Sequence, residues 1–416
     1  MTTSTKRKRS KSEGDIYHYK ISERSKYDEY FKKQDVNKQI DILNREEEVY
    51  NYFKSDTPIR YKILYSKLPI GTKSLILQKI DIFEKMTDTD NEYYKLSKWL
   101  NGLSQIPFDI YVSMPVSIND TDVIVQKFLF DSYNILSKTI YGQYNAKNKI
   151  MQILAQWITN PNSTGQIIAL EGPPGVGKTS LIKHGVSKAL GRPFCFYALG
   201  GATDVSNLEG HSYTYEGAIW GRMVEMLMEC KVMNPVIFFD ELDKISESIK
   251  GNEITGLLTH LTDYTQNNVF QDKYFTGVDI DMSKAIFFFS YNNIDLINPI
   301  LKDRLTIVKF NGYTIDEKVK IVIDFIIPQL LVNIGFAKYD IIICDDTIKY
   351  IINKYTNNED GVRNIKRCIE EIFLKINLLR LMKNKESSIS IDIKYYIDDM
   401  IFPLNIDYNI ADKMLC

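Results

Sequence analysis

One short segment of the chain combines a lysine, a threonine and three glycines at a spacing suited to phosphate chemistry. It reads Gly172-Pro-Pro-Gly-Val-Gly-Lys-Thr179, and it lies between a strand-like apolar run and an amphipathic stretch that ends at Leu190. Glycine permits unusual backbone conformations, so several N–H groups can converge on one phosphate near the positive end of a helix. The order of strand, loop and helix predicts a nucleotide site, with Lys178 on the β- and γ-phosphates and Thr179 on Mg²⁺. The alternative, a turn that binds nothing, is disfavoured because both flanking elements are present.

Two carboxylates end a second apolar run, Val236-Ile-Phe-Phe-Asp240-Glu241. Such a run is typical of a central parallel strand, whose carboxyl end lies beside the phosphate loop. We expect Asp240 to bind Mg²⁺ with Thr179, and Glu241 to polarise the attacking water. The alternative is that these two carboxylates only form the solvated end of a strand. The expected nucleotide-binding residues are Gly172, Pro173, Pro174, Gly175, Val176, Gly177, Lys178, Thr179, Ser180 and Asp240.

Three further polar residues stand where they could assist this chemistry. Asn292 follows the apolar run Ile286-Phe-Phe-Phe289, so its amide could orient water or contact the γ-phosphate. Arg304 lies before the last apolar run and could stabilise charge on a transferring phosphoryl group. Arg363 opens a long amphipathic segment and could reach back to the nucleotide. Taken singly each signal is weak, because a surface ion pair is the default for an arginine.

Composition limits the classes of protein that the chain can belong to. Hydrophobic residues make up 44% and charged residues 25% of 416 residues, with a formal net charge of −1. These values describe a globular chain of two or three domains. Its net charge gives no overall electrostatic attraction to nucleic acid or anionic lipid. No uncharged apolar run reaches membrane-spanning length, and the amino terminus is polar. Five scattered cysteines suggest reduced thiols in an intracellular protein, and four dispersed histidines disfavour a metalloenzyme.

The chain divides into segments of different pattern. Residues 1–14 are polar and contain the basic cluster Lys6-Arg-Lys-Arg9, which fits a nuclear address or a phosphate-contacting arm and equally a solvated tail. Apolar residues recur at helical spacing through much of 15–130. Beyond Asn311-Gly312 the pattern is helical again, which indicates a second, smaller domain. Between these regions apolar runs alternate with helical stretches, which predicts a parallel sheet with helices on both sides. The runs are 166–171, 194–199, 236–240, 285–291 and 306–310.

Together these motifs resemble the AAA+ ATPase module of the Lon protease family, over roughly residues 90–405. The segments that carry the resemblance are Glu171–Leu181, Ala198–Gly201, Gly210–Ala218, Gly221-Arg222, Asn234–Lys244, Asp303-Arg304, Gly312–Thr314 and Gly361–Asn364. The Gly210–Ala218 and Gly361–Asn364 segments are typical of the family and not only of ATPases. The resemblance implies an α/β fold, an AAA+ P-loop parallel sheet with flanking helices, at 131–312. A helical N-terminal region at 15–130 would precede it, and a small all-α lid at 313–405 and a tail at 406–416 would follow.

The resemblance also implies a mechanism. Six subunits would form a ring in which each ATP and Mg²⁺ is held by one subunit and completed by Arg304 of its neighbour. Asn292 and Arg363 would act as the first and second sensors of nucleotide state. Tyr215 matches the aromatic residue of the pore loop that grips an unfolded polypeptide, and closure of the two domains would drive its movement.

Three departures from the family pattern affect these expectations. The sequence stops at Cys416, so no residues correspond to the protease domain with its Ser–Lys pair, and no peptidase activity is expected. The large N-terminal recognition domain is replaced by about 90 residues of different sequence. In the pore segment Glu216 follows Tyr215 and Trp220 stands where proline is usual, so Tyr213 or Trp220 could share the grip.

These observations predict an intracellular, soluble and cytoplasmic Mg-ATPase that remodels or unfolds proteins without cutting them. A motor acting on nucleic acid in replication or packaging is an alternative that the basic cluster supports, although the near-neutral charge and the pore segment disfavour it. An ATPase partner of a separate protease, or an assembly scaffold, is a further alternative. No membrane association is expected. Fold alone does not choose among these functions.

Overall fold

The computed structural model describes residues 28–52, 57–90, 92–161, 167–246, 248–382, 395–397 and 400–415. The chain divides into two compact units, Met1–Leu64 and Tyr65–Cys416. The described part of the first unit holds the helices α2 (Asp28–Lys32) and α3 (Val36–Tyr52) and most of α4 (Ile59–Tyr65). The segment 1–14 with its Lys6–Arg9 cluster lies outside the described residues.

The second unit begins with four helices, which confirms the helical region that the sequence predicts ahead of the sheet. They are α5 (Ile70–Phe83), α6 (Tyr93–Gln105), α7 (Asp122–Thr139) and α8 (Tyr144–Thr159). An irregular segment lies between α6 and α7. Helices α7 and α8 are separated at Gly142 and Gln143, which both have positive φ. None of the described helices is long and apolar enough to cross a membrane.

A five-stranded, fully parallel sheet forms the centre of the second unit, as the alternation of apolar and helical runs predicts. Its strand order is β2-β3-β4-β1-β5. After β1 the chain crosses to the far edge of the sheet to form β2, and it returns to the other side of β1 to form β5. The register pairs Leu170 of β1 with Ser290 of β4 and Val308 of β5, which aligns the carboxyl ends of these three strands. The strands are β1 (Ile167–Glu171), β2 (Phe194–Ala198), β3 (Val236–Asp240), β4 (Ile286–Tyr291) and β5 (Thr306–Lys309).

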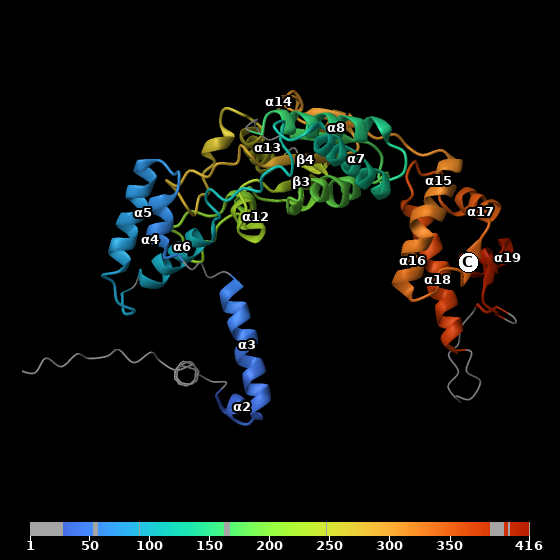
Figure 1. Ribbon diagram of the computed structural model, residues 1–416, viewed down its shortest axis with the longest axis horizontal. Helices are drawn as coiled ribbons and strands as arrows, with labels where there is room; N and C mark the ends of the chain where they lie inside the picture. The colour runs from blue at the N-terminus through green and yellow to red at the C-terminus, as the bar shows by residue number, and fades with distance from the viewer. Residues whose placement is uncertain are drawn as a thin grey trace, which may run out of the picture. The chain divides into compact units, whose positions relative to one another are not determined.

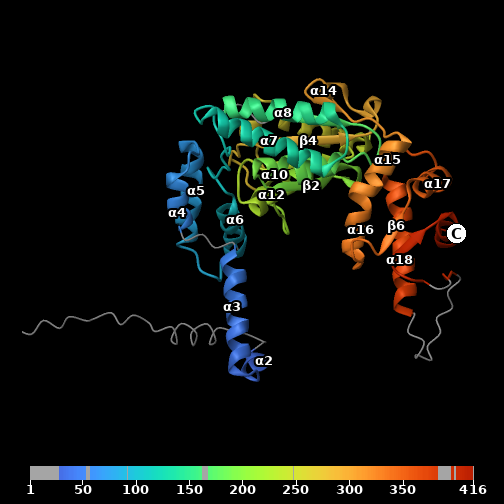
Figure 2. The same cartoon turned by 45° about the vertical axis from the view of Figure 1, so that its right-hand side comes forward.

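Both faces of the sheet are buried, which explains why the inner strands are continuous apolar runs and not alternating ones. On one face Leu170, Phe238 and Phe288 pack against α7, α8 and the helix that follows β1. Figures 1 and 2 show α7 and α8 running along this side. On the opposite face the Phe239 ring stacks on Phe287 and Phe289, with centroids 6.3 and 5.2 Å away. Each such ring contributes roughly 1.5–3 kcal/mol by burial, and together they fix the strand ends that carry polar residues.

A helical lid follows the sheet, as predicted, and it also contains two short strands that the sequence did not reveal. A continuous helical segment runs from α15 (Ile315–Ile321) through η6 (Val322–Ile326) to α16 (Ile327–Ile334). It packs with α17 (Asp345–Tyr355) and α18 (Arg363–Met382) around a separate apolar core. Strands β6 (Ile341–Ile343) and β7 (Leu404–Ile406) pair in parallel at the edge of this core. Three-residue strands leave too little pattern for detection.

The described residues 406–415 of the segment that we expected to be a tail, 406–416, pack into the lid core. They include α19 (Tyr408–Leu415), whose Ala411 and Met414 side chains are fully buried. The carboxylate of Asp412 accepts hydrogen bonds from Tyr350 (2.8 Å) and Tyr355 (2.7 Å) of α17. Two turns of helix are too short for their apolar spacing to stand out in the sequence.

Replacing Met414 with alanine tests whether α19 supports the lid. Loss of a buried methionine side chain leaves a cavity, so we expect the lid to lose about 2–5 kcal/mol of unfolding free energy. The exposed Asn409 on the same helix is the matched control, and Asn409→Ala should change stability by less than about 0.5 kcal/mol. Differential scanning calorimetry measures both. Equal unfolding temperatures for the two variants would contradict the packing described for α19.

Candidate functional site

The glycine-rich loop follows β1 and turns directly into a helix. Gly175 has φ +80° and Gly177 has φ +93°, conformations that side chains disfavour. The helix begins with α9 (Lys178–Ser180) and continues through η1 (Leu181–Val186) and α10 (Ser187–Leu190). Backbone N–H groups at a helix start of this kind face an anion, and the helix dipole favours negative charge there.

Lys178 lies at the centre of the site and connects two strands. Its ammonium group donates hydrogen bonds to the carbonyl oxygen of Gly172, the carbonyl oxygen of Tyr291 (2.9 Å) and Oδ1 of Asn292 (2.8 Å). Burial lowers the pKa of Lys178 to about 8, while Asp240 and Asp243 oppose this shift. The lysine therefore carries its charge in a partly desolvated place, where it interacts more strongly with a phosphate than in water.

The acidic residues after β3 hold polar groups of the neighbouring strand. Oδ1 of Asp240 accepts hydrogen bonds from the Ser290 hydroxyl and from the backbone N–H of Glu241 (3.1 Å). Three residues after Asp240, the buried Asp243 accepts the backbone N–H groups of Asn292 (3.2 Å) and of the residue that follows it (3.1 Å). Asp243 thus fixes the backbone that presents the Asn292 amide. Neither Ser290 nor Asp243 stands out in the sequence.

Glu241 adopts a left-handed backbone conformation, with φ +60°. This conformation is uncommon for a residue other than glycine, asparagine or aspartate, and it is found at functional sites more often than elsewhere. The Glu241 side chain is exposed, and its Oε2 lies so close to Gly200 that a Cβ there would be only 2.3 Å away. A larger residue at 200 would displace the carboxylate.

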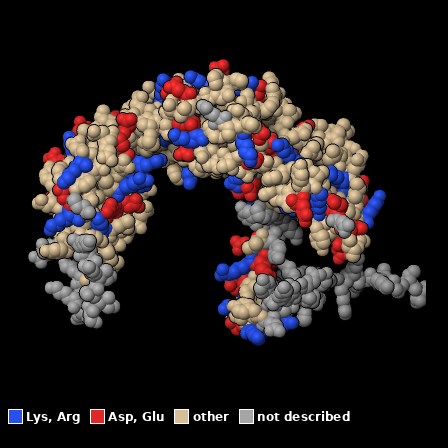
Figure 3. Space-filling view, turned by 180° about the vertical axis from the view of Figure 1, so that it is seen from behind, with Lys and Arg blue, Asp and Glu red and all other residues tan. Residues whose placement is uncertain are grey.

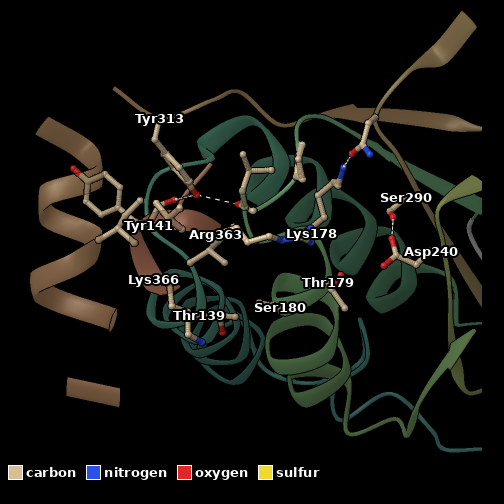
Figure 4. A pocket seen from close by; sticks show the side chains of 18 of the residues that line it. Thr139, Tyr141, Lys178, Thr179, Ser180, Asp240, Ser290, Tyr313, Arg363 and Lys366 are labelled. Atoms are coloured by element: carbon tan, nitrogen blue, oxygen red, sulfur yellow. Dashed lines mark hydrogen bonds between the residues drawn. The ribbon is translucent and has the colours of Figure 1, made fainter. Parts of the chain in front are cut away.

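A cavity of about 380 Å³ opens between the phosphate loop, the carboxyl ends of β3 and β4, and the lid. This volume is within the range of small-molecule sites. Figure 4 shows Lys178, Thr179, Asp240, Ser290 and Arg363 around it. The predicted residues that line it are Pro174, Gly175, Val176, Gly177, Lys178, Thr179, Ser180, Asp240, Glu241, Asn292 and Arg363.

The other end of the cavity is apolar and was not predicted. Ile140, Ile321, Phe325 and Val362 line it, together with the ring of Tyr313. These residues come from the ends of α7 and α18, from the lid and from the connection between the sheet and the lid. A planar apolar group, such as a nucleobase, fits such a lining better than a phosphate does.

The first residues of α18 and those just before it touch the phosphate loop. The backbone N–H of Val362 donates to the carbonyl oxygen of Gly175 at 3.2 Å. Gly361 approaches so closely that a Cβ there would lie 2.2 Å from the Pro174 oxygen. From the connection to the lid, the Tyr313 hydroxyl donates to the carbonyl oxygen of Val176 at 3.0 Å. The loop and the lid are therefore in direct contact through backbone atoms.

The segment that contains Tyr215 stands apart from this cavity and has a rigid base. Buried Asp272 accepts the backbone N–H of Gly221 (2.7 Å) and that of Tyr274 (2.8 Å), and burial raises its pKa to about 7. The Tyr215 side chain is 68% exposed. Tyr213 and Trp220, by contrast, pack edge to face on the Tyr274 ring, at 5.7 and 5.8 Å.

Two family descriptions match the chain over these elements. The description "ATPase family associated with various cellular activities (AAA)" matches residues 168–313, and "Lon protease AAA+ ATPase lid domain" matches residues 333–389. The chain carries the AAA+ ATPase module of the Lon protease family. The resemblance found in the sequence motifs is thereby confirmed.

Similar proteins carry the same family name. A "Lon protease homolog" of Acanthamoeba polyphaga mimivirus is 39% identical over 330 residues, which are 78% of this chain and 32% of that protein. A "Lon protease" of Campylobacter concisus is 33% identical over 398 residues, covering 93% of this chain and 47% of that protein. A mitochondrial homologue of Schizosaccharomyces pombe is 33% identical over 308 residues, covering 74% and 28%. The chain thus spans between 28% and 47% of the length of these relatives.

Arg304 is the one predicted catalytic residue of this Lon-type module that does not line the cavity. Its guanidinium forms an ion pair with Asp263 at 2.7 Å, and its side chain is 33% exposed. Thr265 and Arg304 hold the pKa of the Asp263 carboxyl well below its usual range. Within a single chain, therefore, Arg304 lies outside the site that contains Lys178.

The lowered pKa of Lys178 leads to a testable pH dependence in the Lon-type module. A deprotonated amine does not attract phosphate, so ATP affinity should fall as the pH rises past about 8. By linkage, ATP affinity should be about tenfold weaker one pH unit above this pKa. A lysine with the ordinary pKa near 10.4 would keep its charge, and its ATP affinity, at that pH. Titration with a fluorescent ATP analogue between pH 6.5 and 9.5 measures this. Lys178→Arg is the control, because arginine keeps its charge over the whole range.

An affinity of the parent protein that stays constant to pH 9.5 would contradict the burial of Lys178. A fall of the same size in Lys178→Arg would assign the titration to another group.

Proposed function

We propose that this chain is a Mg-dependent ATPase of Lon type that assembles into a hexameric ring and moves polypeptide through it. One observation carries the proposal: a single cavity gathers Lys178, Thr179, Asp240, Asn292 and Arg363 beneath a lid that contacts the phosphate loop. Each of these residue types has a separate task in phosphoryl transfer. Their convergence from the loop, the strand ends and the lid is the arrangement that this chemistry requires.

The donors at the polar end of the cavity fit a magnesium ion. Thr179 offers a hydroxyl and Asp240 a carboxylate, and both are hard oxygen ligands of the kind that Mg²⁺ prefers. Ser290 donates its hydroxyl to Asp240, which orients the carboxylate. The ion would neutralise charge on the β- and γ-phosphates. The apolar end, with Ile140 and Phe325, would receive the adenine.

In the proposed reaction, water attacks the γ-phosphorus, the bond from that phosphorus to the bridging oxygen breaks, and the oxygen leaves with ADP. Glu241 accepts a hydrogen bond from the attacking water and takes its proton. Lys178 and Arg363 balance the negative charge on the transferring group. A phosphate oxygen would take the position that Oδ1 of Asn292 holds on Lys178. When the phosphate oxygen replaces Oδ1 of Asn292 on Lys178, the Asn292 side chain is released. The end of β4 would thus respond to the state of the nucleotide.

The lid would follow the phosphate loop because hydrogen bonds to the backbone of the loop join them. The contact of Val362 with Gly175 and the contact of Tyr313 with Val176 leave little room for independent motion. A change of the loop on hydrolysis would therefore rotate the lid, and with it the neighbouring subunit. The exposed Tyr215 on its rigid base would convert this rotation into a pull on an unfolded chain.

We further propose that peptide-bond cleavage is not among the activities of these 416 residues. Among the described residues, those after α18 include β7 and α19, and both pack into the lid core. The described residues of the second unit are thus occupied by the helices before the sheet, the nucleotide domain and the lid.

Mixing two inactive variants tests the ring and the role of Arg304. Arg304→Ala should lower ATP turnover by about 10³-fold or more, the usual contribution of an arginine finger. Lys178→Ala should abolish ATP binding in its own subunit while keeping an intact Arg304 for its neighbour. Mixed in equal amounts, the two should recover turnover, measured as phosphate release. Arg304→Lys is the control, because lysine keeps the positive charge but lacks the planar guanidinium that binds a phosphate through two hydrogen bonds.

No recovery in the mixture, with both variants shown to assemble, would argue that Arg304 does not act across subunits.

A comparison of polymer substrates distinguishes a polypeptide motor from a nucleic-acid motor. On the face shown in Figure 3, basic and acidic side chains are interspersed, which gives no basic track for a phosphate backbone. Casein, an unfolded protein, should raise ATP turnover severalfold, whereas single- and double-stranded DNA should leave it unchanged. Salt titration provides the control, because DNA binding would weaken steeply between 50 and 200 mM salt. Stimulation by DNA alone would overturn the proposed substrate class.

A further inference from the structure

Two lysines of α6 reach across to the segment that carries Tyr215. Nζ of Lys98 donates to the carbonyl oxygen of Ala218 at 2.9 Å, and Nζ of Lys95 donates to that of Thr214 at 3.4 Å. These two carbonyls stand on either side of Tyr215 in the sequence. The contacts join residues about 120 positions apart, so they tie the helix ahead of the nucleotide domain to a loop within it.

Aromatic contacts attach the same loop to α5 and α6 from a second side. The Tyr213 ring lies between the ammonium groups of Lys79 and Lys95, at 5.1 and 4.9 Å from its centroid. Lys79 also stands over the Trp99 ring at 4.9 Å. Cation–π contacts of this kind contribute most where they are partly desolvated, and Tyr213 is half-buried.

The base of the loop rests directly on α6. The Trp220 ring stacks on Phe275 with centroids 6.0 Å apart. It lies so close to Gly102 of α6 that a Cβ there would be 2.7 Å from the indole. On the next turn of the helix, Nε1 of Trp99 donates to the carbonyl oxygen of Tyr274 at 3.0 Å.

The tip of the loop, in contrast, is not held by close packing. A cavity of about 510 Å³ separates α6 from the tip, and Tyr94, Lys95, Tyr215 and Glu216 are among its lining residues. Lys95 and Lys98 both line this cavity, and they donate their hydrogen bonds to the loop beside it. Both lysines donate to carbonyl oxygens of one loop, and Lys95 also pairs with Glu92 at the start of α6 at 3.6 Å.

We propose that Lys95 and Lys98 are positioning residues that hold the Tyr215 loop in the orientation that grips polypeptide. This inference rests on the proposed function of Tyr215 and adds its control by α6. A tilt of α6 would withdraw both ammonium groups, release the loop and weaken the grip. Segments of the chain before the nucleotide domain would thus regulate substrate affinity without touching the nucleotide.

The test uses the full chain with the double substitution Lys95→Met and Lys98→Met. Methionine keeps an unbranched apolar stem of similar length and removes the ammonium donors. With the slowly hydrolysed analogue ATPγS present, the Kd for fluorescein-labelled casein should rise about tenfold, the effect of losing a charge-assisted hydrogen bond. Lys98→Arg in the otherwise unchanged chain should stay within about twofold of the parent, because arginine can still donate to the Ala218 carbonyl.

Two further measurements separate a positioning role from general damage. The casein concentration for half-maximal stimulation of ATP turnover should rise in the double variant while the maximal rate is kept. Lys85→Met, which removes one exposed charge just after α5, should change neither value. Loss of ATPγS affinity in the double variant would contradict a role confined to the loop.

Tyr215→Ala distinguishes the failure of this inference from the failure of the proposed function. If Tyr215→Ala raises the Kd for casein and the double lysine variant does not, the proposed control by α6 is wrong. The proposed role of Tyr215 in gripping polypeptide is then retained. If neither variant changes the Kd, Tyr215 does not grip polypeptide, and the inference fails with the function on which it rests.

Discussion

The hydrogen bonds of the Lys178 ammonium group are the interaction on which the rest of the site depends. They join the start of the phosphate loop to the end of β4 through Gly172, Tyr291 and Asn292. Asp243 holds the same end of β4 from the other side. A buried charge is tolerated only where its donors find acceptors. The polar contacts of Lys178 thus fix both the geometry of the loop and the position of Asn292.

Around this charge the site is built from parts distant in the sequence and separately stabilised. The sheet supplies strand ends whose positions are fixed by the buried rings of Phe239, Phe287 and Phe289. The lid has its own apolar core and meets the phosphate loop at Gly175 and Gly361. Two separately packed apolar cores joined by a few hydrogen bonds suit a cycle in which a small change at a phosphate becomes a rotation.

The sequence predicted the parallel sheet and many of the residues that line the cavity because their patterns are local. A glycine loop between a strand and a helix, and a carboxylate pair after an apolar run, both fall within short windows. Asp243, Ser290 and Asp272 were missed because their roles arise from backbone N–H groups or side chains brought close only by the fold. The same reason applies to the contact of Cys195 with Cys230, whose sulfur atoms lie 2.7 Å apart although 35 residues separate them.

The central claim is that the cavity of one chain is completed by Arg304 of another, so that turnover requires assembly. Sedimentation velocity with ATP and Mg²⁺, with phosphate release followed in the same samples, tests it most directly. We predict a species of ring size and a turnover per subunit that falls as dilution dissociates the ring. A chain that stays monomeric and still hydrolyses ATP, or that assembles and shows no turnover, would contradict it.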